Sequence, residues 1–140
     1  MKEVEKKNSR RGKLARASGA RFELKVRGEL ESQGWILDKW TNNVDIETKG
    51  LIKARRKYNP FFRALSVGTG FPDFVCFRKK GKLYEIIGVE CKSKGLLDRE
   101  EKEKCRILLG KGIFLKILIA RKSKKRGAID YDNFEDKYLK

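Results

Sequence analysis

The segment that most restricts the possible folds is the nearly continuous apolar run IFLKILIA at residues 113–120. Such a run is typical of a strand that is buried on both faces, which requires other layers on each side of a sheet. Residues 73–77 (DFVCF) and 82–92 (KLYEIIGVECK) also have strand composition, and the RKKG between them predicts a hairpin. The chain is therefore expected to build a sheet around a buried central strand.

Two helices are predicted around these strands. Residues 17–33 carry large apolar side chains at a spacing of four before Gly34, namely Phe22, Val26 and Leu30. Residues 96–109 combine charged and apolar side chains and end at glycines, which predicts a second helix. Residues 35–40 (WILDKW) predict another strand, and the TNN that follows predicts a turn.

The resulting element order is helix, three strands, helix and strand. This order predicts an α/β or α+β fold, with a central mixed sheet of about four to five strands flanked by helices. A chain of 140 residues fits one domain. We expect residues 1–16 to be a basic flexible arm and residues 17–140 to form the domain, with a basic loop at about 47–70 and a last short element near the end.

The charge of the chain points to a polyanionic partner. Its 36 Lys and Arg against 19 Asp and Glu give a formal net charge of +17. This excess disfavours a compact state unless a polyanion or salt offsets it, so nucleic acid is the expected partner. No apolar run approaches the roughly 20 residues of a membrane span, and the Lys-rich start lacks a signal-peptide core. We therefore expect an intracellular, cytoplasmic protein without a membrane partner.

Histidine and cysteine usage narrows the possible chemistry. The chain contains no histidine, which excludes His-dependent bases, His-metal nucleases and Cys2His2 fingers. The three cysteines, Cys76, Cys91 and Cys105, are 15 and 14 residues apart, a spacing that fits neither a zinc ribbon nor a disulfide framework. We interpret all three as small core residues, so any metal ion must be held mainly by oxygen.

Strand alternation separates the side chains of residues 82–92 into two sets, because successive side chains point to opposite faces. One face carries Ile87, Val89 and Cys91, and the other carries Gly88, Glu90 and Lys92. Across the hairpin, Asp73 follows Pro72 at the start of the preceding strand, and antiparallel pairing can bring it within reach of Glu90. Two adjacent carboxylates repel unless a cation lies between them, and Mg²⁺ or Mn²⁺ takes such ligands. The alternative is that Glu90 and Lys92 are solvated residues at a strand end.

At this point the residues resemble a family. Pro72-Asp73, followed 17 residues later by Glu90-Cys91-Lys92, resembles the signature of the PD-(D/E)XK nuclease superfamily, and the predicted element order over residues 17–121 resembles its core. Short length, a glycine-containing loop before Pro-Asp and the segment ECKSKG look most like archaeal Holliday junction resolvases and related viral nucleases. The resemblance implies a restriction-endonuclease-like core and favours an archaeal or archaeal-virus origin.

The resemblance also implies roles for individual residues. Asp73 and Glu90 would bind Mg²⁺ or Mn²⁺ together with the backbone carbonyl of Cys91, and Lys92 would position or deprotonate the attacking water. Glu23 on the first helix matches a further catalytic glutamate of the family, although it could instead form an ion pair with Arg27 four residues later. Some members carry a glutamine in the helix after the lysine, where this chain has Glu100, Glu101 and Lys104.

The basic loop at 47–70 supplies candidate DNA contacts. Cationic residues there alternate with Tyr58, Phe61 and Phe62, which could stack on exposed bases or anchor the loop to the core. The candidate DNA-binding residues are Lys53, Arg55, Arg56, Lys57, Arg63, Ser66, Thr69 and Lys94. Trp35 and Trp40 are expected to pack in the core or at a sheet edge.

The leading hypothesis is a divalent-metal-dependent endodeoxyribonuclease that is selective for DNA structure. A Holliday junction resolvase needs two active sites on opposing strands, which implies a homodimer. The rival hypothesis is a non-catalytic basic nucleic-acid-binding protein, and a third is a catalytically inactive member of the same fold. Salt-dependent binding is expected of all of them, so only the acidic cluster separates catalysis from binding.

Overall fold

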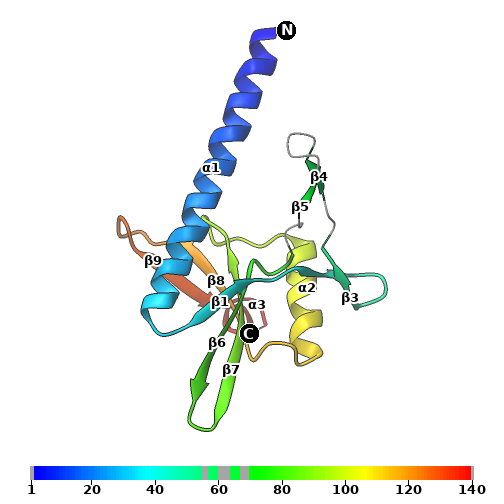
Figure 1. Cartoon of the computed structure of the whole chain (residues 1–140), viewed down its shortest axis with the longest axis vertical. Helices are drawn as coiled ribbons and strands as arrows, with labels where there is room; N and C mark the ends of the chain where they lie inside the picture. The colour runs from blue at the N-terminus through cyan, green and yellow to red at the C-terminus, as the bar shows by residue number, and fades with distance from the viewer. Residues whose placement is uncertain (1, 55–56, 60–63, 67–69, 140) are drawn as a thin grey trace.

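The computed structural model describes residues 2–54, 57–59, 64–66 and 70–139 and has an α+β fold (Figure 1). Its helices are α1 (Lys2–Ser32), α2 (Arg99–Gly110) and α3 (Phe134–Tyr138). Its strands are β1 (Ile36–Lys39), β2 (Asn42–Asp45), β3 (Gly50–Lys53), β4 (Lys57–Asn59), β5 (Ala64–Ser66), β6 (Phe74–Lys80), β7 (Leu83–Cys91), β8 (Ile117–Lys122) and β9 (Ile129–Asn133).

A five-stranded mixed sheet forms the centre of the fold, in the order β1-β6-β7-β8-β9. Strands β7 and β8 are parallel, and the other neighbouring pairs are antiparallel. Helix α2 connects the two parallel strands, as a parallel pair requires a crossover connection. The predicted fold class, the mixed sheet and the hairpin of β6 and β7 are confirmed.

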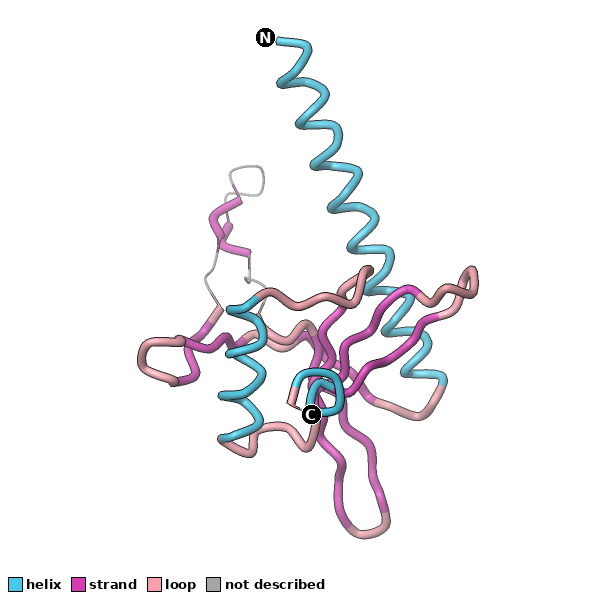
Figure 2. Tube along the Cα trace, turned by 180° about the vertical axis from the view of Figure 1, so that it is seen from behind, coloured by secondary structure: helices cyan, strands magenta, loops and turns pink. Residues whose placement is uncertain are grey.

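Helices cover the sheet on both faces (Figure 2). On one face, α1 packs Phe22, Val26 and Leu30 into a core that also contains Trp35 and Leu37. On the other face, a second core gathers side chains from α2 and α3, with Cys105, Leu108 and Phe134 fully buried. Strand β8 contributes to both cores, with Ala120 in the first and Ile117 and Ile119 in the second. The prediction that this strand is buried on both faces is confirmed, although the middle strand of the sheet is β7 rather than β8.

Helix α1 differs from the predicted one in its start. It begins at Lys2 rather than near residue 17, so the segment predicted to be a flexible arm is helical. Its composition explains the helix, since Lys, Arg, Leu and Ala have high helix propensity and the segment contains no proline. Apolar periodicity could not reveal this half, because it extends away from the sheet (Figure 1).

Other boundaries also differ from prediction. Two of the three residues of the predicted turn at TNN, Asn42 and Asn43, belong to β2, which pairs with β3 in a two-stranded sheet, and β4 pairs with β5. The predicted loop at 47–70 therefore contains strands. Strand β8 begins at Ile117 rather than at residue 113, and residues 129–138 form both a strand and a helix rather than one short element.

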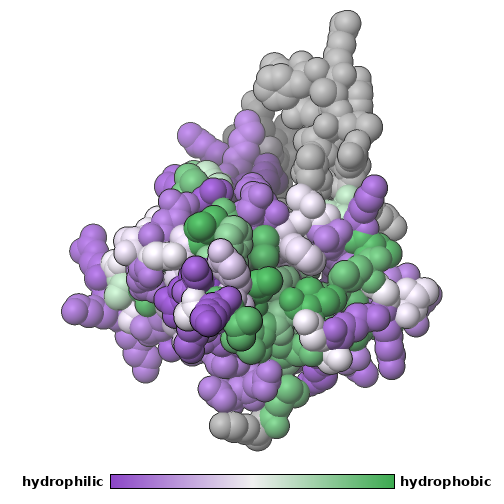
Figure 3. All heavy atoms as spheres, turned by 60° about the horizontal axis from the view of Figure 1, so that its bottom comes forward, coloured by the Kyte–Doolittle hydropathy of each residue, from purple (hydrophilic) through white to green (hydrophobic). Residues whose placement is uncertain are grey.

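One face of the molecule combines hydrophilic side chains with a concentration of apolar ones. Ile36, Ile86 and Leu115 are exposed, and Figure 3 shows hydrophobic residues gathered in the middle of one face. Ile36 and Ile86 lie in one cross-strand row because both pair with Phe77. None of the helices in the described ranges combines the length and hydropathy that a membrane span needs.

Candidate active site

The candidate site lies where β6 begins and β7 ends. The antiparallel register places Phe74 opposite Val89, so the residues just beyond this pair, Asp73 and Glu90, are neighbours. The Cys91 N–H donates to Asp73 Oδ2 at 2.8 Å, and the Asp73 N–H donates to Glu90 Oε1 at 3.2 Å. The predicted meeting of the two carboxylates is confirmed, and one oxygen of each carboxylate is fixed by a backbone amide.

Two glycines allow the chain before Asp73 to approach this strand end. A Cβ atom on Gly88 would lie 2.8 Å from Pro72 Cγ and 3.3 Å from the Phe114 ring, so only glycine leaves room for the buried Pro72. A Cβ atom on Gly70 would lie 2.2 Å from the Trp40 carbonyl oxygen, which accepts a hydrogen bond from the Gly70 N–H. Close backbone packing of this kind fixes Asp73 against β7.

Glu90 is a buried acid. Its exposed fraction is 4%, so the alternative of a solvated residue at a strand end is wrong for Glu90. Burial raises the pKa of Glu90 well above its ordinary value, and a side-chain hydrogen bond with Asp73 and the negative charge of Asp73 raise the pKa further. Without a cation, the pair is therefore driven to hold a proton between its carboxyl groups.

Glu23 reaches the same neighbourhood from α1. Its side chain is half-buried, and burial raises its pKa, followed by the charge of Asp73, while Lys39 acts in the opposite direction. Arg27 pairs with Glu31 at 2.7 Å, so the alternative of a Glu23 to Arg27 ion pair is wrong. Glu23 is thus placed near the carboxylate pair by the helix that covers this face of the sheet.

Lys92 follows the end of β7 and contacts Glu101, for which the sequence predicted no role. Lys92 Nζ lies 2.5 Å from Glu101 Oε2 on α2. Burial alone would lower the pKa of Lys92, but the hydrogen bond with Glu101 and the nearby negative charges outweigh it, so the pKa is raised. Lys92 is consequently held in its charged form beside Glu90 and Asp73.

Glu101 also completes the start of α2. Its Oε1 accepts from the Asp98 N–H at 3.1 Å, while Asp98 Oδ1 accepts from the Glu101 N–H at 2.8 Å. This reciprocal arrangement is a capping box, and the Asp-x-x-Glu spacing before an apolar helix is its sequence signal. That signal fixes where α2 begins, but only the packing of α2 against the sheet brings Glu101 to Lys92.

The ligand set fits a hard cation that keeps part of its water shell. Among the described residues, no group of three or more His, Cys, Asp or Glu side chains is placed to hold one ion. The site instead offers the remaining oxygens of two carboxylates, and Mg²⁺ is commonly bound through one or two carboxylates and the phosphates of its substrate. Burial and adjacent negative charges raise the pKa of the Cys91 thiol, so its sulfur stays protonated and leaves only the backbone carbonyl as a ligand.

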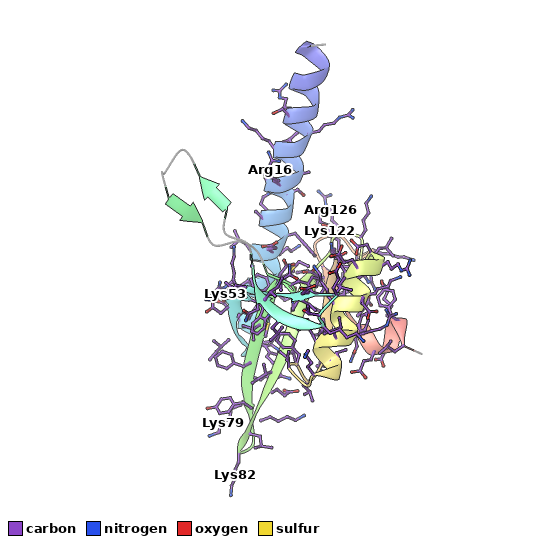
Figure 4. The ribbon with its side chains drawn as sticks, turned by 90° about the vertical axis from the view of Figure 1, so that its right-hand side faces the viewer. Arg16, Lys53, Lys79, Lys82, Lys122 and Arg126 are labelled. Atoms are coloured by element: carbon purple, nitrogen blue, oxygen red, sulfur yellow. The ribbon has the colours of Figure 1, made fainter. Side chains whose placement is uncertain are left out.

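The predicted DNA contacts are placed in part. Lys53 is exposed on β3 (Figure 4), and Lys94 is exposed just after Lys92. Lys57 and Ser66 belong to β4 and β5. The remaining candidates lie outside the described residues: Arg55, Arg56, Arg63 and Thr69.

The two tryptophans and the three cysteines pack as the sequence predicted. Trp35 is buried beneath the Arg78 guanidinium, 4.0 Å from its ring centroid, and Trp40 packs edge-on against Phe114, so both pack as expected. Cys76 and Cys105 are fully buried and Cys91 is half-buried, all three as free thiols. Of the loop aromatics, Tyr58 belongs to β4, and Phe61 and Phe62 lie outside the described residues.

Comparison with protein families, with curated proteins and with solved structures gave no match. The residues of the site and the charge of the surface are therefore the features that indicate a function.

Proposed function

We propose that the protein is a divalent-metal-dependent endodeoxyribonuclease that hydrolyses DNA phosphodiester bonds. The observation that carries the proposal is the pair of backbone hydrogen bonds at the end of β7, from the Asp73 N–H to Glu90 and from the Cys91 N–H to Asp73, which hold a half-buried and a buried carboxylate side by side. Such a pair costs free energy unless a proton or a cation neutralises it. A protein that only bound nucleic acid through positive charge would gain nothing from this acidic pair.

Each side chain of the site suits one part of this reaction. Mg²⁺ or Mn²⁺ bound by Asp73, Glu90 and the Cys91 carbonyl would acidify a water molecule and neutralise the scissile phosphate. Lys92, kept charged by Glu101, stabilises negative charge that develops on the phosphate. Burial and the charge of Asp73 raise the pKa of Glu23, which makes it a stronger base than an ordinary carboxylate for accepting a proton from the attacking water.

We also propose selectivity for branched DNA, in particular four-way junctions. This finer proposal rests on the resemblance of the motif and its surroundings to archaeal junction resolvases. Resolution of a junction requires paired cuts on opposing strands, so the active form would be a homodimer with two equivalent sites. Sedimentation of the protein alone and with a four-way junction tests the dimer independently of cleavage.

The deciding experiment measures cleavage and binding on the same substrates. Four-way junction, linear duplex and single-stranded DNA are incubated with Mg²⁺, Mn²⁺ or EDTA and with wild-type protein, Glu90→Gln or Lys92→Ala. We expect metal-dependent cleavage that falls by at least about 100-fold in both variants while binding in EDTA persists, as loss of transition-state stabilisation alone would give. Glu103→Gln, which changes an exposed carboxylate paired with Arg106, is the matched control and should cleave normally.

The outcomes separate the competing hypotheses. Wild-type cleavage by Glu90→Gln would overturn the catalytic proposal. Tight binding without cleavage in any metal would favour the basic nucleic-acid-binding protein instead. Symmetrically paired nicks on the junction and none on linear duplex would support the resolvase reading, whereas equal cleavage of both would remove it.

A further inference from the structure

The N-terminal half of α1 is strongly basic, and its described side chains from residue 9 to residue 17 are nearly all exposed. Between residues 6 and 22 the sequence contains seven Lys or Arg and no Asp or Glu. Arg10, Arg11, Lys13 and Arg16 are all exposed. Phe22, Val26 and Leu30 lie on the face of α1 that packs into the core. Toward the N-terminus, the same face carries Ala15 and Gly19, which have little apolar surface to bury. Hydrophobic packing therefore does not account for this half of the helix.

A second basic segment lies beside it. The end of β8 and the turn that follows it carry Lys122, Lys124, Lys125 and Arg126, all exposed. It is fastened to α1, because Lys25 Nζ donates to the Gly127 carbonyl oxygen at 2.6 Å. Lys122 Nζ also lies 5.9 Å from the centre of the Phe22 ring. The helix and the turn thus form one continuous basic surface, and Figure 4 shows Lys122 and Arg126 next to α1 below Arg16.

The cations of this surface are available for a ligand. None of the ion pairs among the described side chains involves Arg10, Arg16, Lys122 or Arg126. The neighbouring Arg121 behaves differently, since it contacts Asp130 at 3.1 Å and Asp132 at 2.8 Å. Among the described side chains, the fold therefore pairs Arg121 internally and leaves these four cations without an ion pair.

The surface continues from the candidate active site. Glu23 lies on the same helix, seven residues after Arg16 and thirteen after Arg10. At 1.5 Å per residue, these cations lie about 10 and 20 Å along the axis from Glu23. Since base pairs in duplex DNA rise by about 3.4 Å, the surface reaches roughly six base pairs from the cut.

We propose that the N-terminal half of α1 and the β8–β9 turn bind the phosphate backbone of the duplex that flanks the scissile bond. This inference rests on the proposed function for its choice of DNA, and it adds a binding surface on one side of the site. The role is to position the duplex by sequence-independent contacts, because exposed Lys and Arg interact with phosphates without reading bases.

The test compares two triple variants that remove the same charge. The surface variant carries Arg16→Gln, Lys122→Gln and Arg126→Gln, and the tip variant carries Lys79→Gln, Lys80→Gln and Lys82→Gln at the far end of the β6–β7 hairpin (Figure 4). Binding of a labelled linear duplex is measured in EDTA as a function of salt concentration, so that cleavage does not contribute.

We expect the surface variant to lose roughly two to three from the slope of log affinity against log salt, since each lost phosphate contact removes about 0.9. The tip variant should keep the wild-type slope to within about one contact. Equal losses in both variants, or a wild-type slope in the surface variant, would overturn the proposal. Thermal melting of both variants verifies that each is folded.

The same experiment keeps this proposal separate from the proposed function. Cleavage by Glu90→Gln would remove the catalytic proposal without changing the comparison of the two slopes. Equal slopes, together with metal-dependent cleavage by the wild type, would remove only the surface. A second readout is duplex length: wild-type affinity should rise as about six base pairs are added beyond the site, and the surface variant should lose this gain.

Discussion

The raised pKa of Glu90 couples the candidate site to the stability of the fold. In the unfolded chain this carboxyl titrates near its ordinary value of 4.5, whereas burial and Asp73 keep it protonated to higher pH in the native state. A group with a raised native pKa contributes stability that is fully present below the unfolded pKa and is lost as pH rises through the native pKa. The metal-free protein therefore loses stability from Glu90 as the solution becomes neutral.

Replacing Glu90 with glutamine should remove this loss. In EDTA, we expect Glu90→Gln to be more stable than the wild type at about pH 8, and the difference to shrink toward pH 5. Between the two pKa values the difference should grow by about 1.4 kcal/mol per pH unit. Urea denaturation of both proteins across this range measures it. A difference that is constant with pH, or a less stable variant at pH 8, would contradict the assigned burial of the charge.

The contact between Glu101 and Lys92 leads to a separate prediction about the pKa of Lys92. In Glu101→Gln, the amide oxygen can still accept from the Asp98 N–H, so the cap of α2 is preserved while the negative charge beside Lys92 is removed. The pKa of Lys92 should then fall relative to the wild type, because only the charges of Glu90 and Asp73 still oppose the lowering by burial. We expect kcat to fall roughly tenfold, which corresponds to a loss of about 1.4 kcal/mol in transition-state stabilisation. We also expect the loss of activity at alkaline pH to begin at a lower pH than in the wild type.

The control for this variant is its neighbour. Glu100 is largely exposed and lies 3.7 Å from Lys104, so Glu100→Gln removes the same charge from the same helix without touching Lys92. Its pH profile should match the wild type. Identical profiles for Glu101→Gln and the wild type would mean that Glu101 serves only to begin the helix.

At the level of elements, close packing around Gly88 gives a prediction for β7. Gly88→Ala would place a methyl group 2.8 Å from Pro72, and the residue after Pro72 is Asp73. Overpacking of this kind costs about 1–3 kcal/mol of stability. Because the displaced segment carries Asp73, we also expect weaker stabilisation by Mn²⁺ in thermal melting.

Gly28→Ala is the matched substitution for comparison. Gly28 lies within α1, and a Cβ atom there has nothing within 4 Å. Alanine is favoured over glycine inside a helix, so this variant should be more stable by roughly 0.5–1 kcal/mol. If Gly88→Ala melted at the wild-type temperature, the contact with Pro72 would be looser than the structure places it.

The elements that could be predicted from sequence are those in which the pattern of apolar and polar residues matches the burial of each side chain. Strand β7 alternates exposed and buried residues in its first half and is buried on both faces in its second half, and β8 is apolar on both faces, so the sequence indicated both strands. Strand β3 is exposed along three of its four residues and β2 buries only Val44, so neither carries an alternation to read. The free half of α1 shows no apolar period for the same reason.

The candidate site divides in a similar way. Asp73 and Glu90 were predictable because hairpin pairing relates residues that are close in sequence. Glu101 was not, because its contact with Lys92 depends on where α2 packs against the sheet. Sequence patterns report local geometry directly, whereas a contact between a helix and a strand end follows from the packing of the whole fold.

At the scale of the whole molecule, the net charge of +17 should limit stability in low salt. The Debye length falls from about 10 Å at 0.1 M to about 3 Å at 1 M, which weakens repulsion among the exposed cations. Exposed ion pairs weaken too, but each contributes only about 0–1 kcal/mol. We therefore expect the midpoint of urea denaturation to rise with KCl; a falling midpoint would show that the ion pairs outweigh the repulsion.

The two triple variants extend this prediction and separate charge from position. Each removes three positive charges, one set from the surface formed by α1 and the β8–β9 turn and the other from the tip of the β6–β7 hairpin. Because repulsion depends on the overall charge, both should raise the urea midpoint in low salt and reduce the gain from added KCl by similar amounts. DNA binding should distinguish the same two variants, since phosphate contacts depend on where the cations lie. Stabilisation confined to the surface variant would mean that repulsion is concentrated between α1 and the turn rather than spread over the molecule.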